Sequence, residues 1–270
     1  MKSILLTGGT GFIGSYLIYE LAKRYKVYTI VRKKKFYKNK NIISLSLNQL
    51  KKNKQKNFYA LIHLATHYKS ENNILEFRNF LNSNILFGTE ILEIINLKKI
   101  SKIMYFSTMM EHLDSKIYNP LNLYASSKKS FQDVIMFYKN KYKNIKFYNI
   151  KLYETFGPND KRKKIIPLLI KNYKTKKKII LNSKELKLNF ISVYDVCLGI
   201  KILLEKKIKS DTYLMKAKKN TKILNLIKML NLEKNVTYLN IKQKNFKFKF
   251  KMIPNWKPNY TIEKYIKSFT

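Results

Sequence analysis

Short apolar runs alternate with polar stretches and helical patterns through the first half of the chain. Runs of strand length lie at 4–6, 26–31, 41–47, 59–65 and 103–106. Between them lie Ile13, Leu17 and Leu21 at helical spacing, a polar surface connection at 51–57, and one long helical pattern over 74–97. Strands that alternate with helices predict an α/β fold, a doubly wound parallel sheet with helices on both faces.

The pattern continues past the middle of the chain and weakens towards its end. After 122–128, apolar residues keep helical spacing at Phe131, Val134, Ile135 and Tyr138. A short strand is predicted at 213–215 and a short helix at 223–230. Phe246, Phe248 and Phe250 alternate with lysines, which favours an exposed strand with one apolar face. The same alternation would also suit rings that stack on nucleic-acid bases.

Three glycines at spacing three, Gly8, Gly11 and Gly14, join the first predicted strand to the first helix. The first lets the turn close, the middle one lets a pyrophosphate approach the backbone, and the last lets the helix pack on the strand. Free N–H groups and the positive end of the helix dipole then face the phosphates. We interpret this stretch as a dinucleotide-binding turn, and the alternative is a structural turn without a ligand.

Length and composition narrow the class of protein. The chain has 270 residues, of which 45% are apolar, enough for one large domain or a nucleotide domain with a smaller lobe. Its single cysteine, Cys197, rules out an internal disulfide and suits a reducing compartment. The first strand begins almost at Met1, and no apolar run approaches a membrane span. We therefore expect a cytoplasmic protein without a signal peptide or membrane segment.

The net charge of +40 comes from 56 basic and 16 acidic residues. Only Arg24, Arg32, Arg78 and Arg162 are arginines, and the lysines are spread along the whole chain. We interpret most of them as solvated surface and predict no specific nucleic-acid partner, although the charge favours an anionic substrate.

Arg32 bears on the choice of cofactor because it ends the second predicted strand. In a nucleotide-binding fold an acidic residue here accepts hydrogen bonds from the ribose 2′-hydroxyl, whereas a cation suits a 2′-phosphate. Arg32 is followed by Lys33, Lys34 and Lys35, so the sequence favours NADP(H) over NAD(H). The alternative is that Arg32 belongs to the general surplus of cations.

Catalytic chemistry is indicated by Thr108, Tyr124 and Lys128. Thr108 ends the fifth predicted strand, at the sheet edge where ligands bind. Tyr124 and Lys128 are four residues apart on one helix face, so we expect the ammonium to lower the pKa of the phenol and make Tyr124 a proton donor or acceptor. Thr108 can hydrogen-bond the same substrate oxygen.

Other polar residues have structural interpretations. His63 lies within an apolar run and is expected to be a hydrogen-bonded core histidine, while His67 just beyond it is a weak candidate for the site. Asn84 interrupts the long helix and is expected to bond neighbouring backbone. The three histidines and one cysteine show no metal-ligand spacing, so no metal is predicted.

These features resemble the extended short-chain dehydrogenase/reductases, the NAD(P)-dependent nucleotide-sugar epimerases, dehydratases and reductases. The resemblance covers nearly all of the chain. Beyond the glycine turn and the three catalytic candidates, it includes motifs at 63–65, 84–89, 156–158, 166–167, 190–196 and 256–258.

The resemblance implies roles for individual residues. Thr108, Tyr124 and Lys128 would form the catalytic triad, with Lys128 also holding the nicotinamide ribose. The implied cofactor contacts are Gly8, Thr10, Gly11, Phe12, Ile13, Gly14, Arg32, Leu64, Ala65, Tyr124 and Lys128. The implied substrate contacts are Thr66, Met109, Met110, Glu154, Arg162, Lys164 and Lys187.

The same resemblance implies a domain arrangement and an oligomeric state. Residues 1–155 would form a Rossmann dinucleotide-binding domain to which 187–205 return. Residues 156–186 and 206–270 would form a small substrate-binding lobe. Family members pair through the helix over 74–97 and the helix that carries Tyr124, which implies a homodimer.

Departures from the family pattern narrow the reaction. Met109 and Met110 stand where 4,6-dehydratases carry an Asp-Glu pair, and neither can move a proton. Met110 and Asn159 also replace the cysteine and histidine of the enzymes that epimerise carbons 3 and 5. Glu154 replaces an asparagine that contacts the nucleotide sugar, and Lys187 stands beside the place of a phosphate-binding arginine.

The amino-acid sequences of 111–124 and 152–164 resemble those of the branch of CDP-abequose and CDP-paratose synthases. This implies NADPH-dependent reduction of the 4-keto group of a nucleotide-activated deoxysugar. The cluster 161–164 would bind diphosphate or form a solvated loop. Two alternatives stay open: a 4-epimerase with bound NAD, and a non-catalytic dinucleotide sensor or nucleic-acid-binding protein.

Overall fold

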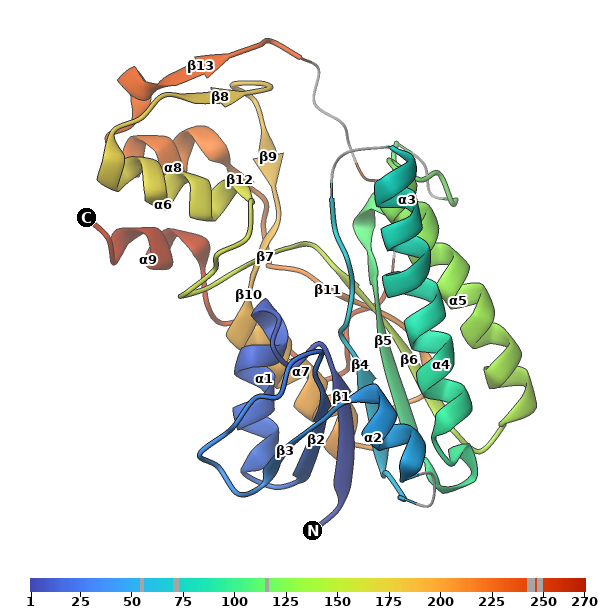
Figure 1. Ribbon diagram of the computed structural model, residues 1–270. Helices are drawn as coiled ribbons and strands as arrows, with labels where there is room; N and C mark the ends of the chain where they lie inside the picture. Colours follow the sequence, from blue (N-terminus) through green and yellow to red (C-terminus); the bar gives the residue numbers. More distant parts are fainter. Residues whose placement is uncertain (54–55, 70–72, 115–116, 242–245, 247–249) are drawn as a thin grey trace.

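The computed structural model describes residues 1–53, 56–69, 73–114, 117–241, 246 and 250–270. A sheet of seven parallel strands forms its centre, in the order β11-β6-β5-β4-β1-β2-β3 (Figure 1). The strands are β1 (Ser3–Thr7), β2 (Lys26–Ile30), β3 (Ile42–Leu45), β4 (Ala60–His63), β5 (Lys102–Thr108), β6 (Lys146–Leu152) and β11 (Asp211–Met215). The predicted doubly wound α/β class is confirmed.

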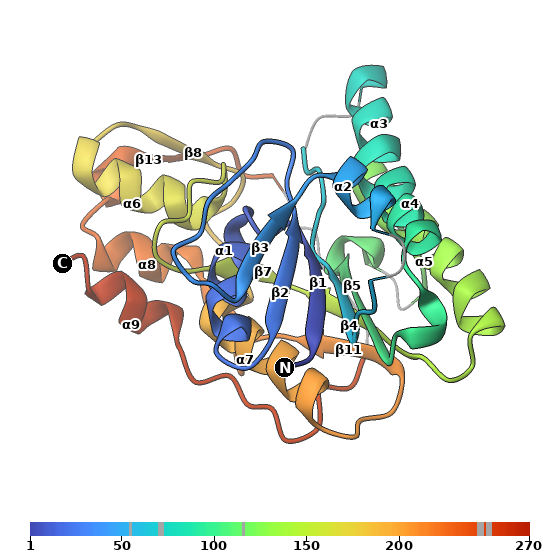
Figure 2. The same cartoon turned by 60° about the horizontal axis from the view of Figure 1, so that its bottom comes forward.

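The sheet is covered on both faces because its side chains alternate (Figure 2). Leu5, Leu61 and Ile103 pack against α2 (Leu47–Lys52), α4 (Phe87–Ile94) and α5 (Leu123–Lys141). Ile4, Ile62 and Met104 pack against the opposite helices, α1 (Phe12–Ala22) and α7 (Val193–Glu205). Strands buried on both faces explain the continuous apolar runs of the sequence.

The helix predicted over 74–97 is interrupted at its centre. It consists of α3 (Ile74–Phe80), a π-helical segment at Leu81–Leu86, and α4, which ends at Ile94. The fully buried Asn84 lies in the π-helical segment. Asn84 bonds the backbone of His67, which is distant in sequence, and the Ser127 hydroxyl. Asn84 therefore bonds backbone as expected, but the backbone belongs to the loop after β4 and not to its own helix, because the segment turns this amide towards other elements.

The small lobe has its own apolar core, centred on Leu169, Leu226 and Ile266. Its helices are α6 (Ile165–Thr175), α8 (Ile223–Met229) and α9 (Ile262–Lys267). Its paired strands are β8 (Ile179–Leu181) with β13 (Val236–Tyr238), and β9 (Lys187–Leu188) with β12 (Thr221–Lys222). The parallel pair β7 (Glu154–Phe156) and β10 (Phe190–Ser192) lies between the lobe and the sheet (Figure 1).

Two boundaries differ from those implied by the sequence. The short strand expected at 213–215 is the sheet's edge strand, β11, which pairs with β6 instead of belonging to the small lobe. Ile253 and Trp256 also pack in the core of the large domain. Conversely, β9 lies within the stretch expected to return to the large domain but pairs with β12. Strand pairing joins segments distant in sequence, so local patterns could not place them.

The described residues also include three short 3₁₀ turns, Leu97–Lys99, Met109–Glu111 and Glu233–Asn235. The polar connection expected at 51–57 begins as the end of α2. The helix expected at 223–230 is confirmed as α8. Phe246 forms an isolated antiparallel bridge with Leu113, whereas Phe248 of the predicted strand lies outside the described residues.

Candidate functional site

The glycine turn between β1 and α1 needs its glycines for internal packing at two positions. Gly8 has a φ of +72°, and a Cβ there would lie 2.6 Å from the Ala65 nitrogen. A Cβ on Gly14 would lie 2.1 Å from the Gly8 carbonyl oxygen. The Gly11 N–H donates to the same oxygen at 2.9 Å. The turn is therefore held tightly against the end of β4.

The middle glycine of the three, Gly11, is less crowded. A Cβ on Gly11 would meet only the Gly8 oxygen, at 3.2 Å, and Gly11 is exposed. Gly11 is also the N-cap of α1, where no side chain caps the helix. First-turn N–H groups with room above them fit the pyrophosphate of a dinucleotide. Thr10, Phe12 and Ile13 flank this position, with Thr10 exposed and the other two half-buried.

The end of β4 lies beside the same turn. The Thr7 hydroxyl accepts a hydrogen bond from the Ala65 N–H at 3.2 Å and lies 2.9 Å from His63 Nδ1. Leu64 and Ala65, which the sequence implies to be cofactor contacts, are thus held next to Gly8. The prediction of a hydrogen-bonded core His63 is confirmed. Burial, with Lys128 nearby, lowers the pKa of His63 to about 3.

Arg32 lies on this same edge of the sheet, just beyond β2. Ile30, the last residue of β2, is in register with Thr7 at the end of β1. The Arg32 side chain is exposed and has no hydrogen-bond or ion-pair partner among the described residues. It is therefore available to a ligand bound on the glycine turn.

The catalytic candidates come from two elements that meet at the carboxyl edge. Thr108 is the last residue of β5, and its buried hydroxyl accepts from the Met110 N–H at 3.2 Å. Tyr124 and Lys128 lie on the first turns of α5, which Asn122 caps. The Tyr124 side chain shares a hydrogen bond with Thr66.

Burial sets the protonation of both α5 residues. It raises the pKa of Tyr124, reinforced by Tyr68, Glu111 and Glu154, while the Thr66 hydrogen bond opposes it. Burial also lowers the pKa of the Lys128 ammonium to about 8, with the Glu111 charge opposing. The expectation that Lys128 lowers the Tyr124 pKa was therefore wrong for this protein. Helical spacing does not reveal how much water the pair loses, and desolvation dominates.

Predicted substrate residues from both domains meet next to Tyr124. The Tyr68 and Tyr124 rings contact edge to face, with centroids 4.8 Å apart. The Lys164 ammonium lies 4.1 Å above the Tyr68 ring and 3.3 Å from a Glu154 oxygen. Lys164 is the N-cap residue of α6 in the small lobe. Thr66, Glu154 and Lys164 are thus brought to the tyrosine.

Arg162 and Lys187 do not join that group. Arg162 bonds both carboxylate oxygens of Asp160 and stacks over the Phe12 ring at 4.2 Å, which places it beside the glycine turn. Lys187 is exposed on β9, where it pairs with Lys222 of β12. Met109 is buried and Met110 partly exposed in the 3₁₀ turn after Thr108.

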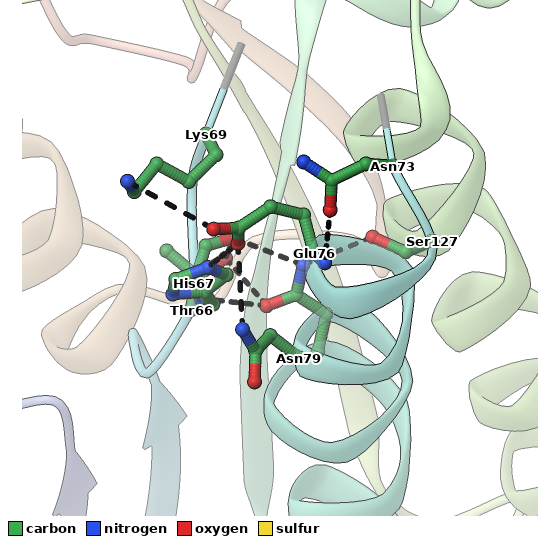
Figure 3. Close-up of polar contacts among 8 residues, drawn as sticks. Thr66, His67, Lys69, Asn73, Glu76, Asn79 and Ser127 are labelled. Atoms are coloured by element: carbon green, nitrogen blue, oxygen red, sulfur yellow. Dashed lines mark hydrogen bonds and ion pairs between the residues drawn. The ribbon is translucent and has the colours of Figure 1, made fainter. Parts of the chain in front are cut away.

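A polar network fixes the loop that carries Thr66 (Figure 3). Asn84 Oδ1 accepts from the Thr66 hydroxyl at 3.0 Å and from the His67 N–H at 2.7 Å, while Nδ2 donates to Ser127 at 2.9 Å. Glu76 of α3 lies 2.5 Å from His67 Nε2. His67, the weak site candidate, therefore turns its ring to α3, and the loop is tied to α3 and α5.

Sequence reasoning missed four residues of this site. They are Tyr68, Glu111, Gln132 and Lys151. Tyr68 follows the end of β4 by five residues, so its place near the ligand-binding edge was a usable signal. The other three form a buried polar cluster behind Thr108, for which the sequence carries no local signal.

The described residues contain no group of three or more His, Cys, Asp or Glu side chains that could hold a metal ion. Within the same described ranges, no helix has the length and apolar character needed to cross a bilayer.

Comparisons with known proteins identify the family of the chain. The model of the NAD dependent epimerase/dehydratase family matches residues 4–215. CDP-abequose synthase of Salmonella muenchen is 30% identical over 76% of this chain and 71% of its own. dTDP-D-glucose 4,6-dehydratase of Dictyostelium discoideum is 27% identical over 76% of this chain and 56% of its own.

The fold also matches solved structures. That of UDP-glucuronic acid 4-epimerase from Bacillus cereus, in complex with UDP-glucuronic acid and NAD, superposes with a TM-score of 0.81 at 20% identity. The match covers 99% of this chain and 100% of that one. At this identity the likeness shows the fold alone.

Proposed function

The chain belongs to the NAD-dependent epimerase/dehydratase family, and on that premise we propose that it is an NADPH-dependent reductase for the 4-keto group of a nucleotide-activated deoxysugar. Membership of this family and the CDP-abequose synthase relative indicate an NAD(P)-dependent enzyme that modifies nucleotide sugars. The observation that carries the proposal of a 4-ketoreductase is the Tyr124 hydroxyl, which shares a hydrogen bond with Thr66 and precedes Lys128 by four residues on α5, together with methionines at positions 109 and 110.

A bound NAD(P)H supplies the hydride. The Gly11 side of the turn would hold its pyrophosphate, Arg32 its ribose phosphate and Lys128 its nicotinamide ribose. Burial keeps the Tyr124 phenol protonated at neutral pH, so it can donate its proton to the sugar oxygen as that oxygen gains negative charge. The Thr108 hydroxyl would orient the same oxygen.

The side chains that follow Thr108 provide no acid or base for dehydration of the sugar. Met109 and Met110 can neither donate nor accept a catalytic proton. The next carboxylate, Glu111, is only 1% exposed and is paired with Lys151. A base that removes a sugar proton needs access to that carbon, and Glu111 has none.

The choice of a CDP-deoxysugar rests on similarity and on local charge. The CDP-abequose synthase relative is named for a CDP-sugar product, and Lys164 places an ammonium beside Tyr68 at the junction of the two domains. We infer that Lys164 contacts the diphosphate of the substrate. Glu154, its partner, would then face the nucleotide sugar in place of the usual asparagine.

We also infer a homodimer. Helices α3 and α5 expose large apolar side chains, including Ile74 at 65%, Leu75 at 67%, Met136 at 51% and Phe137 at 60%. Pairing these helices with those of a second copy would cover them in a four-helix interface.

The proposed reaction is tested by following NADPH oxidation with a panel of CDP- and dTDP-linked 4-keto-6-deoxy and 4-keto-3,6-dideoxy sugars. We expect oxidation with at least one CDP-linked substrate, and at least ~100-fold slower oxidation by the Tyr124→Phe variant. Interconversion of 4-hydroxy epimers without net use of NADPH would instead identify an epimerase. Absence of both reactions across the panel would contradict the proposal.

A further inference from the structure

Glu111 forms a buried ion pair directly behind the catalytic strand end. It is the last residue of the 3₁₀ turn that follows Thr108. One carboxylate oxygen lies 2.5 Å from the Lys151 ammonium of β6, and the two side chains are 2% and 3% exposed. Burial lowers the pKa of Lys151, and the Glu111 charge opposes that shift. The pair is therefore almost fully removed from water.

The other carboxylate oxygen connects β5 to α5. It accepts from the Gln132 amide at 2.9 Å and, more weakly, from the Thr108 N–H at 3.4 Å. The same Gln132 amide donates to the Lys128 carbonyl at 3.2 Å. Asn149 of β6 donates to Gln132 Oε1 at 2.9 Å. One carboxylate thus links the backbone of Thr108 to the helical turn that carries Lys128.

An ion pair in this position is a costly way to stabilise a fold. Desolvating two charges offsets most of their attraction, and apolar replacements of similar volume are often neutral or stabilising. The two apolar clusters of the large domain are built from such side chains. The location of the pair next to Thr108 and Lys128 points to a role beyond packing.

We propose that Glu111 is a positioning residue for the reaction proposed above: its carboxylate holds the backbone of Thr108 and, through Gln132, the turn of α5 that carries Lys128 in register, and so places a negative charge beside that turn. This inference rests on the proposed function for its meaning in catalysis. Glu111 does not act as an acid or base itself, because its oxygens are engaged and it is 1% exposed.

The charges around Glu111 are consistent with this role. Lys151 on β6 and Lys128 on α5 are the cations that it faces, and Tyr105, Tyr124 and His112 are the other titratable groups that respond to its charge. Its charge raises the pKa of Lys128, whereas burial lowers it to about 8. Burial and the Glu111 charge therefore act on the Lys128 ammonium in opposite directions.

The test measures Lys128 directly, without a sugar substrate. Protein with ¹³C at the lysine ε-carbons is titrated by NMR, and the Lys128→Arg variant identifies the Lys128 signal by its loss. We expect a midpoint near pH 8 in the wild type. In Glu111→Gln the midpoint should fall by about one pH unit, because the carboxylate charge is removed.

A second variant controls for the loss of stability expected when the buried Lys151 ammonium is left unpaired. Glu111→Gln combined with Lys151→Met removes both charges and keeps the Gln132 contact available, so it should fold. It should lower the Lys128 midpoint by less than Glu111→Gln does, because loss of the Lys151 charge acts in the opposite direction. A midpoint that is unchanged in folded Glu111→Gln, or not lowered in the folded double variant, would overturn the proposal and leave Glu111 a purely structural residue. Because no sugar is used, a lowered midpoint supports the role of Glu111 even if the substrate panel shows no reduction.

Discussion

The ring of Tyr68 stands edge-on against the ring of Tyr124, with centroids 4.8 Å apart and the ring planes at 89°. The Lys164 ammonium, at the start of α6 in the small lobe, lies 4.1 Å from the Tyr68 ring centroid. Tyr68 thus makes both a cation–π contact and an edge-to-face contact. The two domains of the protein therefore meet at the proposed proton donor.

The proton-donor role of Tyr124 predicts the effect of removing its hydroxyl. Tyr124→Phe should lower kcat at least ~100-fold, the scale of acid–base groups, and leave the NADPH dissociation constant little changed. The ring contacts with Tyr68 and Phe80 survive the substitution, so the fold should be retained. Steady-state kinetics with a substrate from the panel, together with cofactor titration by fluorescence, provide the measurement. A Phe variant with near-normal kcat would remove Tyr124 from the mechanism.

The contact of Lys164 with Tyr68 and Glu154 predicts a binding effect. Lys164→Met should raise KM for the nucleotide sugar roughly tenfold to a hundredfold with little change in kcat, because a charge-assisted bond to phosphate contributes about 1.5–3 kcal/mol. Lys163→Met is the matched control, since Lys163 is exposed on the same loop. Equal KM values for the two variants would show that Lys164 does not touch the diphosphate.

The position of Arg32 predicts cofactor preference. Its guanidinium can hold a 2′-phosphate through two parallel bonds, so we expect the wild type to prefer NADPH roughly tenfold to a hundredfold in kcat/KM. Arg32→Asp should reverse this ratio, although Lys33, Lys34 and Lys35 keep the local potential positive. Lys26→Asp makes the same charge change at the other end of β2 and should leave the ratio unaltered. A wild type that prefers NADH would contradict this assignment.

Buried His63 predicts how stability depends on pH. Its pKa is about 3 in the folded protein, below the ordinary value of 6.5, so between these values the unfolded chain binds one more proton. The free energy of unfolding should therefore fall as pH drops below 6.5, by at most about 1.4 kcal/mol per pH unit from this group, and level off above 6.5. His63→Leu should flatten that slope in urea unfolding measured from pH 7 to 4.5. An unaltered slope would mean that other groups carry the dependence.

The apolar surface of α5 predicts self-association. Phe137, 60% exposed, should be covered in the proposed homodimer, so Phe137→Glu should raise the dimer dissociation constant at least ~10-fold by burying a carboxylate. Phe36→Glu, at a loop position that is 81% exposed, is the control and should not change it. Sedimentation at micromolar concentration gives the answer, and a monomeric wild type would rule out the interface.

Local sequence was sufficient where the responsible contacts are close in the chain. The turn at Gly8, Gly11 and Gly14 follows from backbone geometry within seven residues, so the spacing of its glycines was enough to identify it. Tyr124 and Lys128 share a helix face because four residues make about one turn. Alternation of apolar runs and helical patterns likewise determined the class of the fold, because the spacing of apolar residues within each element shows which of its faces is buried.

The sequence alone could not determine quantities that depend on which distant segments meet. The pKa of Tyr124 is raised because the surrounding elements exclude water from it, and that burial outweighs the expected effect of Lys128. Arg162 was placed with Lys164, yet it pairs with Asp160 over Phe12.

Long-range pairing decided the remaining features. β11 joins the sheet through β6, some 60 residues earlier in the chain, and Glu111 meets Lys151 across 40 residues. Periodicity records which face of an element avoids water, but not which partner covers it. The sequence by itself thus determined the elements, the glycine turn and the Tyr124–Lys128 face. Only the tertiary structure decided the charges of these groups and the partners around them, because desolvation and ion pairing act between segments that packing brings together.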